Sequence, residues 1–258
     1  MASLAPPIGW TASAQTVRRR VSLALEKEAR KARRPSLRLL VAELSYVAEP
    51  VLQRVRDLAD PYVLPKTHEP QTVMLVPGFL SHPVRMRRMA HKLEQAGHKV
   101  KRWGQGMNTG VSEDRLRLAE QRLVDLHRRY GRKVWLVGWS LGGLYAREIA
   151  KLQPDLVAGV ITMGSPFSGD LRANNAWRVY QLVAGHRVDQ VPVEARLAEK
   201  PPVPTIALWS PRDGVIDPRC AAGRPGERDR AVALRCSHMD FAFSRTAIRA
   251  VARELDRS

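Results

Sequence analysis

The sequence has little cysteine, few aromatic residues and no long apolar run. Cys220 and Cys236 are the only cysteines among 258 residues, and aromatic residues make up 6%. Two cysteines exclude a disulfide-stabilised miniature fold and provide no cluster for structural zinc. No apolar stretch approaches the roughly 20 residues that cross a bilayer, and Val21 to Leu25 is too short for a signal peptide. We therefore expect a cytoplasmic protein that needs neither metal nor cofactor.

Acidic residues are also scarce, since 25 Asp and Glu face 43 Lys and Arg for a formal net charge of +18. Nine of the basic residues lie between Arg18 and Arg38, where only Glu26 and Glu28 oppose them. Such a charge favours anionic surfaces, either phospholipid headgroups or nucleic acid. The chain has no zinc-finger spacing, no basic region joined to heptads and no aromatic-interleaved RNA-binding signature. We therefore do not expect nucleic acid to be its main partner.

Residues 1–66 are predicted to form a basic helical arm. One helix is expected over Val17 to Arg33, and a second over Leu37 to Leu58, where Pro50 can introduce a kink. The second stretch carries apolar residues at helical spacing, namely Leu37, Leu40, Leu44, Val47, Val51 and Val55. This stripe either packs on the following domain or, with the basic face, makes the arm a peripheral anchor on anionic membrane.

Residues 67–258 alternate short β-branched runs with helical patterns, which predicts an α/β domain with a mainly parallel sheet and helices on both faces. The expected strands are Thr72–Val76, Lys99–Arg102, Lys133–Gly138, Val157–Thr162, Thr205–Trp209 and Ala231–Leu234. Helices are expected near 84–96, 113–130, 141–152 and 241–256. The stretch 167–204 breaks this rhythm, and it is either a helical lid over the strand ends or an ordinary long connection.

The most informative motif is Gly-Trp-Ser-Leu-Gly, residues 138–142, which follows a buried strand and opens a helix. This is the arrangement of a nucleophile elbow, in which a strained turn exposes a serine. Residues two before and two after that serine must be small, and Gly138 and Gly142 meet this need. We predict that Ser140 is a catalytic nucleophile.

Attack by a serine hydroxyl creates an oxyanion that needs two pre-placed N–H donors. One is normally the residue after the nucleophile, here Leu141. The sequence Val76-Pro77-Gly78-Phe79 ends the first expected strand of the domain, at the edge where open α/β sheets bind ligands. We therefore expect the Phe79 amide to be the second donor.

The base and the acid should follow the nucleophile in the chain order serine, acid, histidine. Of seven histidines, His238 alone lies beyond the last expected strand. Asp213 follows a strand end in the loop Asp-Gly-Val-Ile, where a carboxylate can hold the imidazole tautomer. Asp217 and Asp170 remain alternative acids, Asp170 because it matches the acid position used by some lipases.

Six segments carry a resemblance to a known family: Val-Pro-Gly-Phe, Gly-Trp-Ser-Leu-Gly-Gly with Tyr-Ala-Arg-Glu, Ile-Thr-Met-Gly-Ser-Pro-Phe-Ser-Gly-Asp, Asn-Ala-Trp-Arg, Ser-Pro-Arg-Asp-Gly-Val-Ile and Ser-His-Met. Together, over roughly Leu75 to Leu255, the chain resembles bacterial α/β hydrolases of the lipase and esterase type. The resemblance implies the α/β-hydrolase fold, the triad Ser140, Asp213 and His238, and oxyanion donors Phe79 and Leu141. Relatives commonly have glycine and an apolar residue after the histidine, whereas this chain has Met239-Asp240-Phe241. We expect the Asp240 carboxylate to perturb the pKa of His238.

The predicted activity is hydrolysis of carboxylic esters through an acyl-enzyme. Apolar residues near the expected site suggest an apolar acyl or alcohol group in the substrate, with Leu80, Trp139, Phe167 and Trp177 as substrate-binding residues alongside Phe79. Two alternatives are an acyltransferase with the same triad, and a catalytically silent adaptor that binds anionic surfaces. Cys220 and Cys236 flank the acid and base loops, and we expect two free thiols rather than a disulfide.

Overall fold

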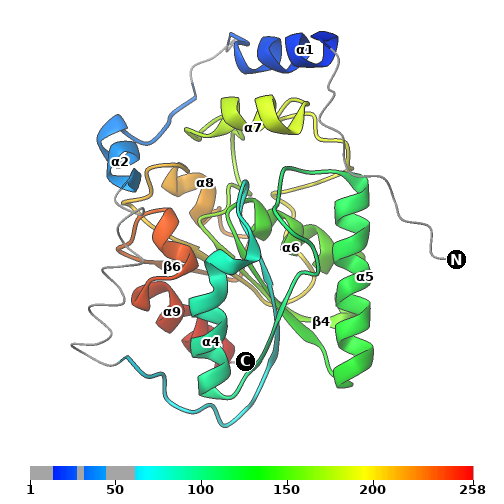
Figure 1. The fold of residues 1–258 in the computed structure, drawn as a ribbon. Helices are drawn as coiled ribbons and strands as arrows, with labels where there is room; N and C mark the ends of the chain where they lie inside the picture. Colours follow the sequence, from blue (N-terminus) through cyan, green and yellow to red (C-terminus); the bar gives the residue numbers. More distant parts are fainter. Residues whose placement is uncertain (1–13, 28–31, 45–61, 258) are drawn as a thin grey trace, which may run out of the picture.

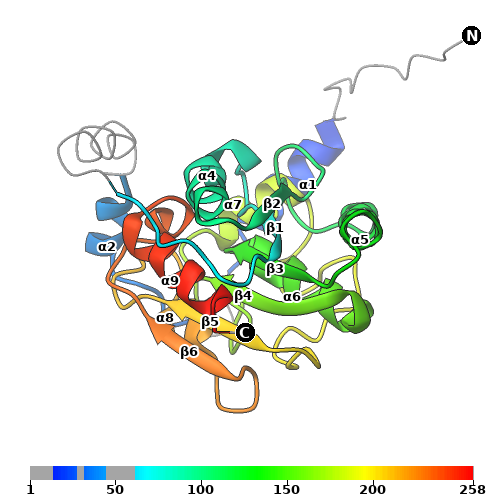
Figure 2. The same cartoon turned by 90° about the horizontal axis from the view of Figure 1, so that it is seen from below.

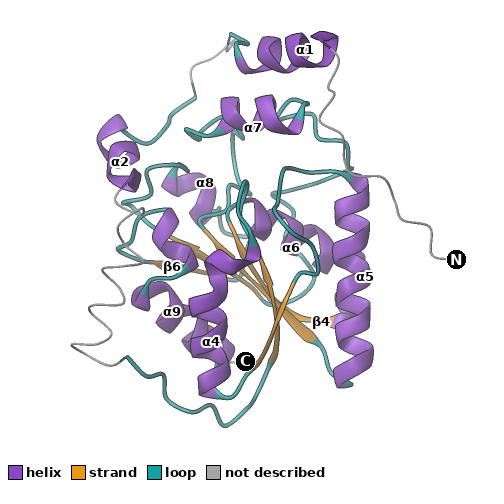
Figure 3. Cartoon of the chain, viewed as in Figure 1, coloured by secondary structure: helices purple, strands orange, loops and turns teal. Residues whose placement is uncertain are grey.

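A six-stranded parallel sheet forms the centre of the molecule (Figure 1 and Figure 3). The computed structural model describes residues 14–27, 32–44 and 62–257. The strands are β1 Thr72–Val76, β2 Lys99–Arg102, β3 Val134–Trp139, β4 Val157–Met163, β5 Thr205–Trp209 and β6 Arg230–Ala233. Their spatial order is β2-β1-β3-β4-β5-β6, and every neighbouring pair is parallel. The six predicted strands are confirmed, each end within one residue.

Helices cover both faces of this sheet, as the alternation of strand and helix patterns in the sequence predicts. One face carries α4 Arg87–Ala96, preceded by the 3-10 turn η2 Pro83–Met86, and α9 Arg245–Leu255, preceded by the 3-10 turn η4 Met239–Ala242. The other face carries α5 Glu113–Tyr130 and α6 Leu141–Leu152, as Figure 2 shows from below. Two short helices, α7 Trp177–Ala184 and α8 Pro218–Ala222, and the 3-10 turn η3 Pro154–Leu156 complete this part.

Alternate side chains of the buried strands supply two separate cores. Val73 and Leu75 of β1 pack under α4 and α9, whereas Met74 and Val76 point to the layer beneath α5 and α6. Because successive residues of a strand point to opposite faces, a strand covered on both sides must be apolar throughout. This explains why β1 and β3 have every residue buried.

Helix α1, Ala14–Ala24, lies across α7 at the top of the molecule (Figure 1). It ends well before Arg33, where the sequence pattern placed the end of the helix. The Leu23 carbonyl accepts from the Glu26 amide and from the Gln181 side chain, and the Ala24 carbonyl accepts from Arg178. Glu26 then pairs with Arg172 and Arg187, so contacts with the α/β domain end the helix.

Helix α2, Leu37–Ala42, is the described part of the second predicted arm helix, and residues 45–61 of that prediction lie outside the described residues. Within the described part the apolar stripe does not pack as one face, because Leu37 and Leu44 remain 73% and 67% exposed. Tyr62 and Leu64 are buried in the core under α4 and α9, so packing against the α/β domain already includes residues before 67. None of the described helices is long and apolar enough to cross a membrane.

Candidate active site

Ser140 lies between the end of β3 and the first residue of α6 in a strained backbone conformation. Its φ is 53° and its ψ is −122°, and Leu80 is the other described residue besides glycines with a positive φ. A side chain at positive φ costs free energy that surrounding contacts must offset. Here the Ser140 amide donates to the Met163 carbonyl at 2.8 Å, which ties the turn to the end of β4.

The glycines around Ser140 are required by close approach of the backbone, as the sequence predicts. A Cβ at Gly138 would lie 2.3 Å from the Gly142 carbonyl oxygen, and a Cβ at Gly142 would lie 2.2 Å from the Val76 carbonyl oxygen. Strand β3, helix α6 and the end of β1 therefore meet with no room for a side chain. This contact lets the turn at Ser140 form against the sheet.

Replacing Gly142 by alanine should destabilise the protein strongly. The added methyl would press on the backbone of β1, which cannot rotate away as a side chain can, so we expect the free energy of unfolding to fall by about 3 kcal/mol or more. Urea denaturation measures this loss. Gly106→Ala is the matched control, because a Cβ there would meet nothing within 4 Å, and its effect should stay within about 0.5 kcal/mol. Equal stability of the two variants would contradict the described contact.

His238 and Asp213 form a buried pair, and the His238 ring lies 5.9 Å from the ring of Trp139, the residue before Ser140. His238 Nδ1 lies 2.8 Å from Asp213 Oδ2, and both side chains are almost completely buried. The second oxygen of Asp213 accepts hydrogen bonds from the amides of Val215 and Ile216 at 2.8 and 2.7 Å. These bonds fix the carboxylate, so the carboxylate in turn fixes the orientation of the imidazole.

The other two candidate acids lie elsewhere. Asp217 is the N-cap of α8 and accepts from the Arg219 amide, and Asp170 accepts from the Arg172 amide at the same distance of 2.8 Å. Both carboxylates thus satisfy local backbone donors. The structure brings only Asp213, of the three, to His238.

The environment of His238 raises the pKa of its imidazole. Burial by itself opposes the charged form, but the charge and hydrogen bond of Asp213 favour it, and the Glu43 carboxylate adds to this. The carboxylate expected to perturb His238, that of Asp240, instead accepts from the Ser237 amide at 3.1 Å. The second carboxylate acting on His238 is therefore Glu43, which comes from α2 of the arm rather than from the neighbouring residue.

The turn after β1 lies against the turn at Ser140, since a Cβ at Gly78 would lie 3.2 Å from the Ser140 Cβ, and Phe79 and Leu141 both line the same cavity. Neither the Phe79 nor the Leu141 amide donates a hydrogen bond to another group among the described residues, which leaves both N–H groups free for a ligand. Asn108, which the sequence did not single out, braces this turn. Its side-chain amide donates to the Pro77 carbonyl at 2.9 Å, and its backbone exchanges hydrogen bonds with Leu80 and Ser81.

No family model and no curated protein matches this sequence, but solved structures match its fold. A metagenome-derived lipolytic enzyme matches with a TM-score of 0.55 and 15% identity, over 76% of this chain and 97% of that one. A pyrethroid hydrolase matches with a TM-score of 0.50 and 17% identity, over 73% and 98%. A Xanthomonas campestris pv. campestris protein assigned to the α/β hydrolase superfamily has a TM-score of 0.50 and 21% identity, over 73% and 99%. This chain has the α/β-hydrolase fold.

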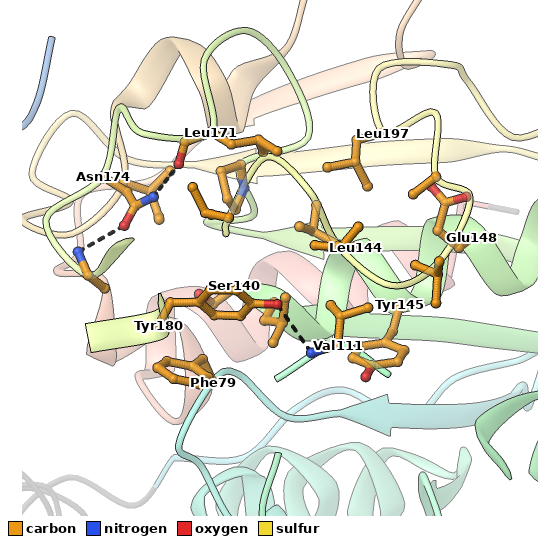
Figure 4. Close-up of a pocket in the computed structure, with 18 of the residues that line it drawn as sticks. Phe79, Val111, Ser140, Leu144, Tyr145, Glu148, Leu171, Asn174, Tyr180 and Leu197 are labelled. Atoms are coloured by element: carbon orange, nitrogen blue, oxygen red, sulfur yellow. Dashed lines mark hydrogen bonds between the residues drawn. The ribbon is translucent and has the colours of Figure 1, made fainter. Parts of the chain in front are cut away.

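At the strand ends of this α/β-hydrolase fold, Ser140 opens into an apolar cavity (Figure 4). Phe79 and Tyr180 stand at the Ser140 end, with ring centroids 5.1 Å apart, and Glu148 and Leu197 stand at the far end. Most of the lining is aliphatic or aromatic, and much of it comes from one stretch: Leu171, Asn174, Ala176, Tyr180, Val188, Val191, Val193, Ala195 and Leu197. The segment 167–204 therefore covers the cavity, which is the position predicted for a lid.

Of the residues that the sequence suggested for substrate binding, Phe79 lines the cavity and the other four do not. Trp139 donates from its indole nitrogen to the His238 carbonyl at 3.1 Å, and Leu80 is exposed on the turn after β1. Phe167 is buried under the Arg147 guanidinium, 4.1 Å from its ring centroid. Trp177 is buried among guanidinium groups, including those of Arg34, Arg172 and Arg178. The three aromatic residues therefore pack in the interior of the α/β domain rather than around the cavity.

Arg147 holds the covering segment onto helix α6. It is fully buried, and its guanidinium donates to the carbonyls of Leu197, Ala198 and Glu199, and to that of Glu227. Burial lowers its pKa to about 10, which still leaves it charged at neutral pH. In the sequence, the available signal was an arginine among the apolar residues of the helix expected after Ser140, but the sequence does not show what this arginine contacts.

The two cysteines are free and buried, as expected. Burial raises the pKa of the Cys220 thiol to about 11, and burial likewise raises that of Cys236. Since the thiolate is the reactive form, both thiols are inert at neutral pH.

Proposed function

We propose that this protein is a serine hydrolase that cleaves carboxylic esters. The supporting observations are the buried Asp213–His238 pair, whose imidazole lies near Trp139, and the strained Ser140 that follows Trp139 and lines an apolar cavity. A binding module has no need for a buried carboxylate that fixes one nitrogen of a histidine. The solved structures that share the fold include lipolytic enzymes and a pyrethroid hydrolase.

In the proposed reaction, the His238 nitrogen that is not bonded to Asp213 takes the proton of the Ser140 hydroxyl as the oxygen attacks the ester carbonyl. The oxyanion then accepts hydrogen bonds from the N–H groups of Phe79 and Leu141. When the tetrahedral intermediate collapses, His238 gives its proton to the leaving alcohol. Water, activated by the same imidazole, hydrolyses the acyl-enzyme and regenerates Ser140. Asp213 stabilises the imidazolium in both halves without itself taking the proton.

The cavity favours an apolar acyl chain of medium length. It follows α6 from Ser140 to Glu148, eight residues, which corresponds to about 12 Å along the helix. That length holds an extended chain of roughly ten carbons, because a C–C bond of about 1.5 Å advances a zigzag chain by about 1.3 Å. At the far end the Glu148 carboxylate pairs with Lys151 at 2.6 Å, and a hydrocarbon reaching further would have to pass these charged groups.

The proposal is tested by hydrolysis of p-nitrophenyl esters from acetate to palmitate, together with covalent labelling by a fluorophosphonate probe. We expect the highest kcat/KM at about eight to ten carbons, and the probe mass on the peptide that contains Ser140. Including an alcohol acceptor distinguishes hydrolysis from acyl transfer by the products formed. A protein that neither hydrolyses any ester nor labels at Ser140 would refute the proposal.

Substituting leucine for Glu148 should extend the range of chains. Removal of the carboxylate at the far end replaces a charged barrier by apolar surface, so we expect kcat/KM for palmitate relative to octanoate to rise by about 10-fold, equivalent to about 1.4 kcal/mol. Glu194→Leu is the control, because Glu194 is exposed and does not line the cavity. An unchanged ratio in the Glu148 variant would place the acyl chain elsewhere.

A further inference from the structure

The N-terminal arm inserts one carboxylate behind the Asp213–His238 pair. Glu43, at the C-terminal end of α2, is only 5% exposed, although its neighbours Leu44 and Val41 face solvent. Its Oε1 accepts from the amides of Gly214 at 2.8 Å and His238 at 2.7 Å, and its Oε2 accepts from the Met239 amide at 3.0 Å. One carboxylate from the arm therefore satisfies three backbone donors of the α/β domain.

These three donors belong to the two loops that carry the acid and the base. Gly214 follows Asp213 directly, and the other two amides are those of His238 itself and of the next residue. The loops reach the site from different strands, after β5 and after β6. Hydrogen bonds to an ionised acceptor are among the stronger ones in proteins, so Glu43 ties the two loops to each other at the position of the Asp213–His238 contact.

The backbone of α2 also packs closely against the loop of Asp213, in contacts that do not involve the Glu43 side chain. A Cβ at Gly214 would lie 2.3 Å from the Leu39 carbonyl oxygen, so this glycine allows the arm to approach. The side-chain amide of Asn175 donates to the carbonyls of Pro35 and Gly214, at 3.2 and 2.8 Å, and thereby links the same two segments. The arm is thus built onto the acid loop at several points.

The charge of Glu43 affects the pKa of His238, because few other charged groups among the described residues lie near the imidazole. Asp213 contacts the imidazole directly, Trp139 and Phe241 pack near the ring, and Asp240 is bonded to the Ser237 amide. Among the described groups, Asp213 and Glu43 are the two carboxylates that raise the pKa of this buried histidine, against its desolvation. Loss of the Glu43 charge should therefore lower that pKa.

We propose that Glu43 is a positioning residue of the active site, through which the N-terminal arm holds the acid and base loops in register. This inference rests on the proposed serine hydrolase function. It makes the arm a part of the catalytic apparatus in addition to any role in surface binding.

The test compares the full-length wild type with Glu43→Gln and with Val41→Ala, an exposed position on the same helix. Glutamine keeps the size of the side chain but removes the charge and presents an NH2 group to a backbone donor. We expect its kcat/KM on an octanoate ester to fall by roughly 10-fold to 100-fold. The acid limb of its pH profile should move to lower pH, because the imidazole then protonates less readily. Val41→Ala should match the wild type in both.

Two measurements separate this inference from the proposed function. The His238 pKa, followed by NMR on histidine-labelled protein, should fall in Glu43→Gln whether or not esters are hydrolysed. Hydrogen exchange of wild-type protein should show the Gly214, His238 and Met239 amides protected, so the test survives if the variant does not fold. An unshifted pKa with an unchanged rate, or amides that exchange as freely as exposed loops, would overturn the inference.

Discussion

Ser140→Ala should lower kcat for ester hydrolysis by about 10⁵-fold to 10⁶-fold, the size of loss seen when a triad serine is removed. The variant lacks the oxygen that forms the acyl-enzyme, so the residual rate reflects only substrate binding and the N–H groups at Phe79 and Leu141. Stability should be nearly unchanged. Alanine also carries a Cβ and meets the same strain at a φ of 53°. Stopped assays at high enzyme concentration, with fluorophosphonate labelling in parallel, measure the effect.

Ser168→Ala is the control for this variant. Ser168 is buried and follows the end of β4, but it does not line the cavity. The control should label and turn over like the wild type. Retention of labelling in Ser140→Ala would mean that another residue carries the reactive hydroxyl, and the assignment of Ser140 would be abandoned.

Asp213→Asn should reduce kcat by about 10⁴-fold while the protein stays folded. The asparagine oxygen can still accept from the amides of Val215 and Ile216, which leaves the NH2 group turned towards His238 Nδ1. That nitrogen would then have to accept rather than donate, so the imidazole would adopt the tautomer that cannot take the serine proton. The pKa of His238 should also fall with the loss of the neighbouring negative charge. Both effects are measured by pre-steady-state kinetics and NMR titration.

Asp217→Asn and Asp170→Asn are the matched controls, because both sites were alternatives for the acid. Asp217 caps α8 and Asp170 caps a loop turn, so each substitution should cost at most about 1 kcal/mol of stability and little activity. If either control lost as much activity as Asp213→Asn, the acid would have to be reassigned.

The predictions from sequence succeeded where the signal is local. Strands β1, β3 and β5 are recognisable because a strand buried on both faces must be apolar along most of its length. The turn at Ser140 is recognisable because two glycines are needed within five residues. The preference for Asp213 over Asp217 also rested on a local signal, the strand end just before it, and Asp213 is the one that pairs with His238.

The cavity lining was not predictable in the same way. Trp139, Phe167 and Trp177 are apolar residues close to the motif in sequence, but a nearby apolar residue can pack into the domain as easily as into a cavity. Tyr180 and Val188 line the cavity because the segment 167–204 covers it, and Arg147 of α6 holds the end of that segment at Leu197 and Glu199. The first arm helix was predicted too long for a related reason, since contacts with the α/β domain end α1.

The sequence by itself determined the order of strands and helices, the strained serine turn, and the serine, aspartate and histidine that this type of sheet places at one edge. Each of these depends on a few neighbouring residues and on the rule that parallel strands bring their carboxyl ends together. Only the tertiary structure decided that Glu43 reaches the loops of Asp213 and His238, across sequence separations of 171 and 195 residues. A lone acidic residue in an otherwise apolar stretch of a basic arm was the available signal, and its partners are fixed by long-range packing rather than by local pattern.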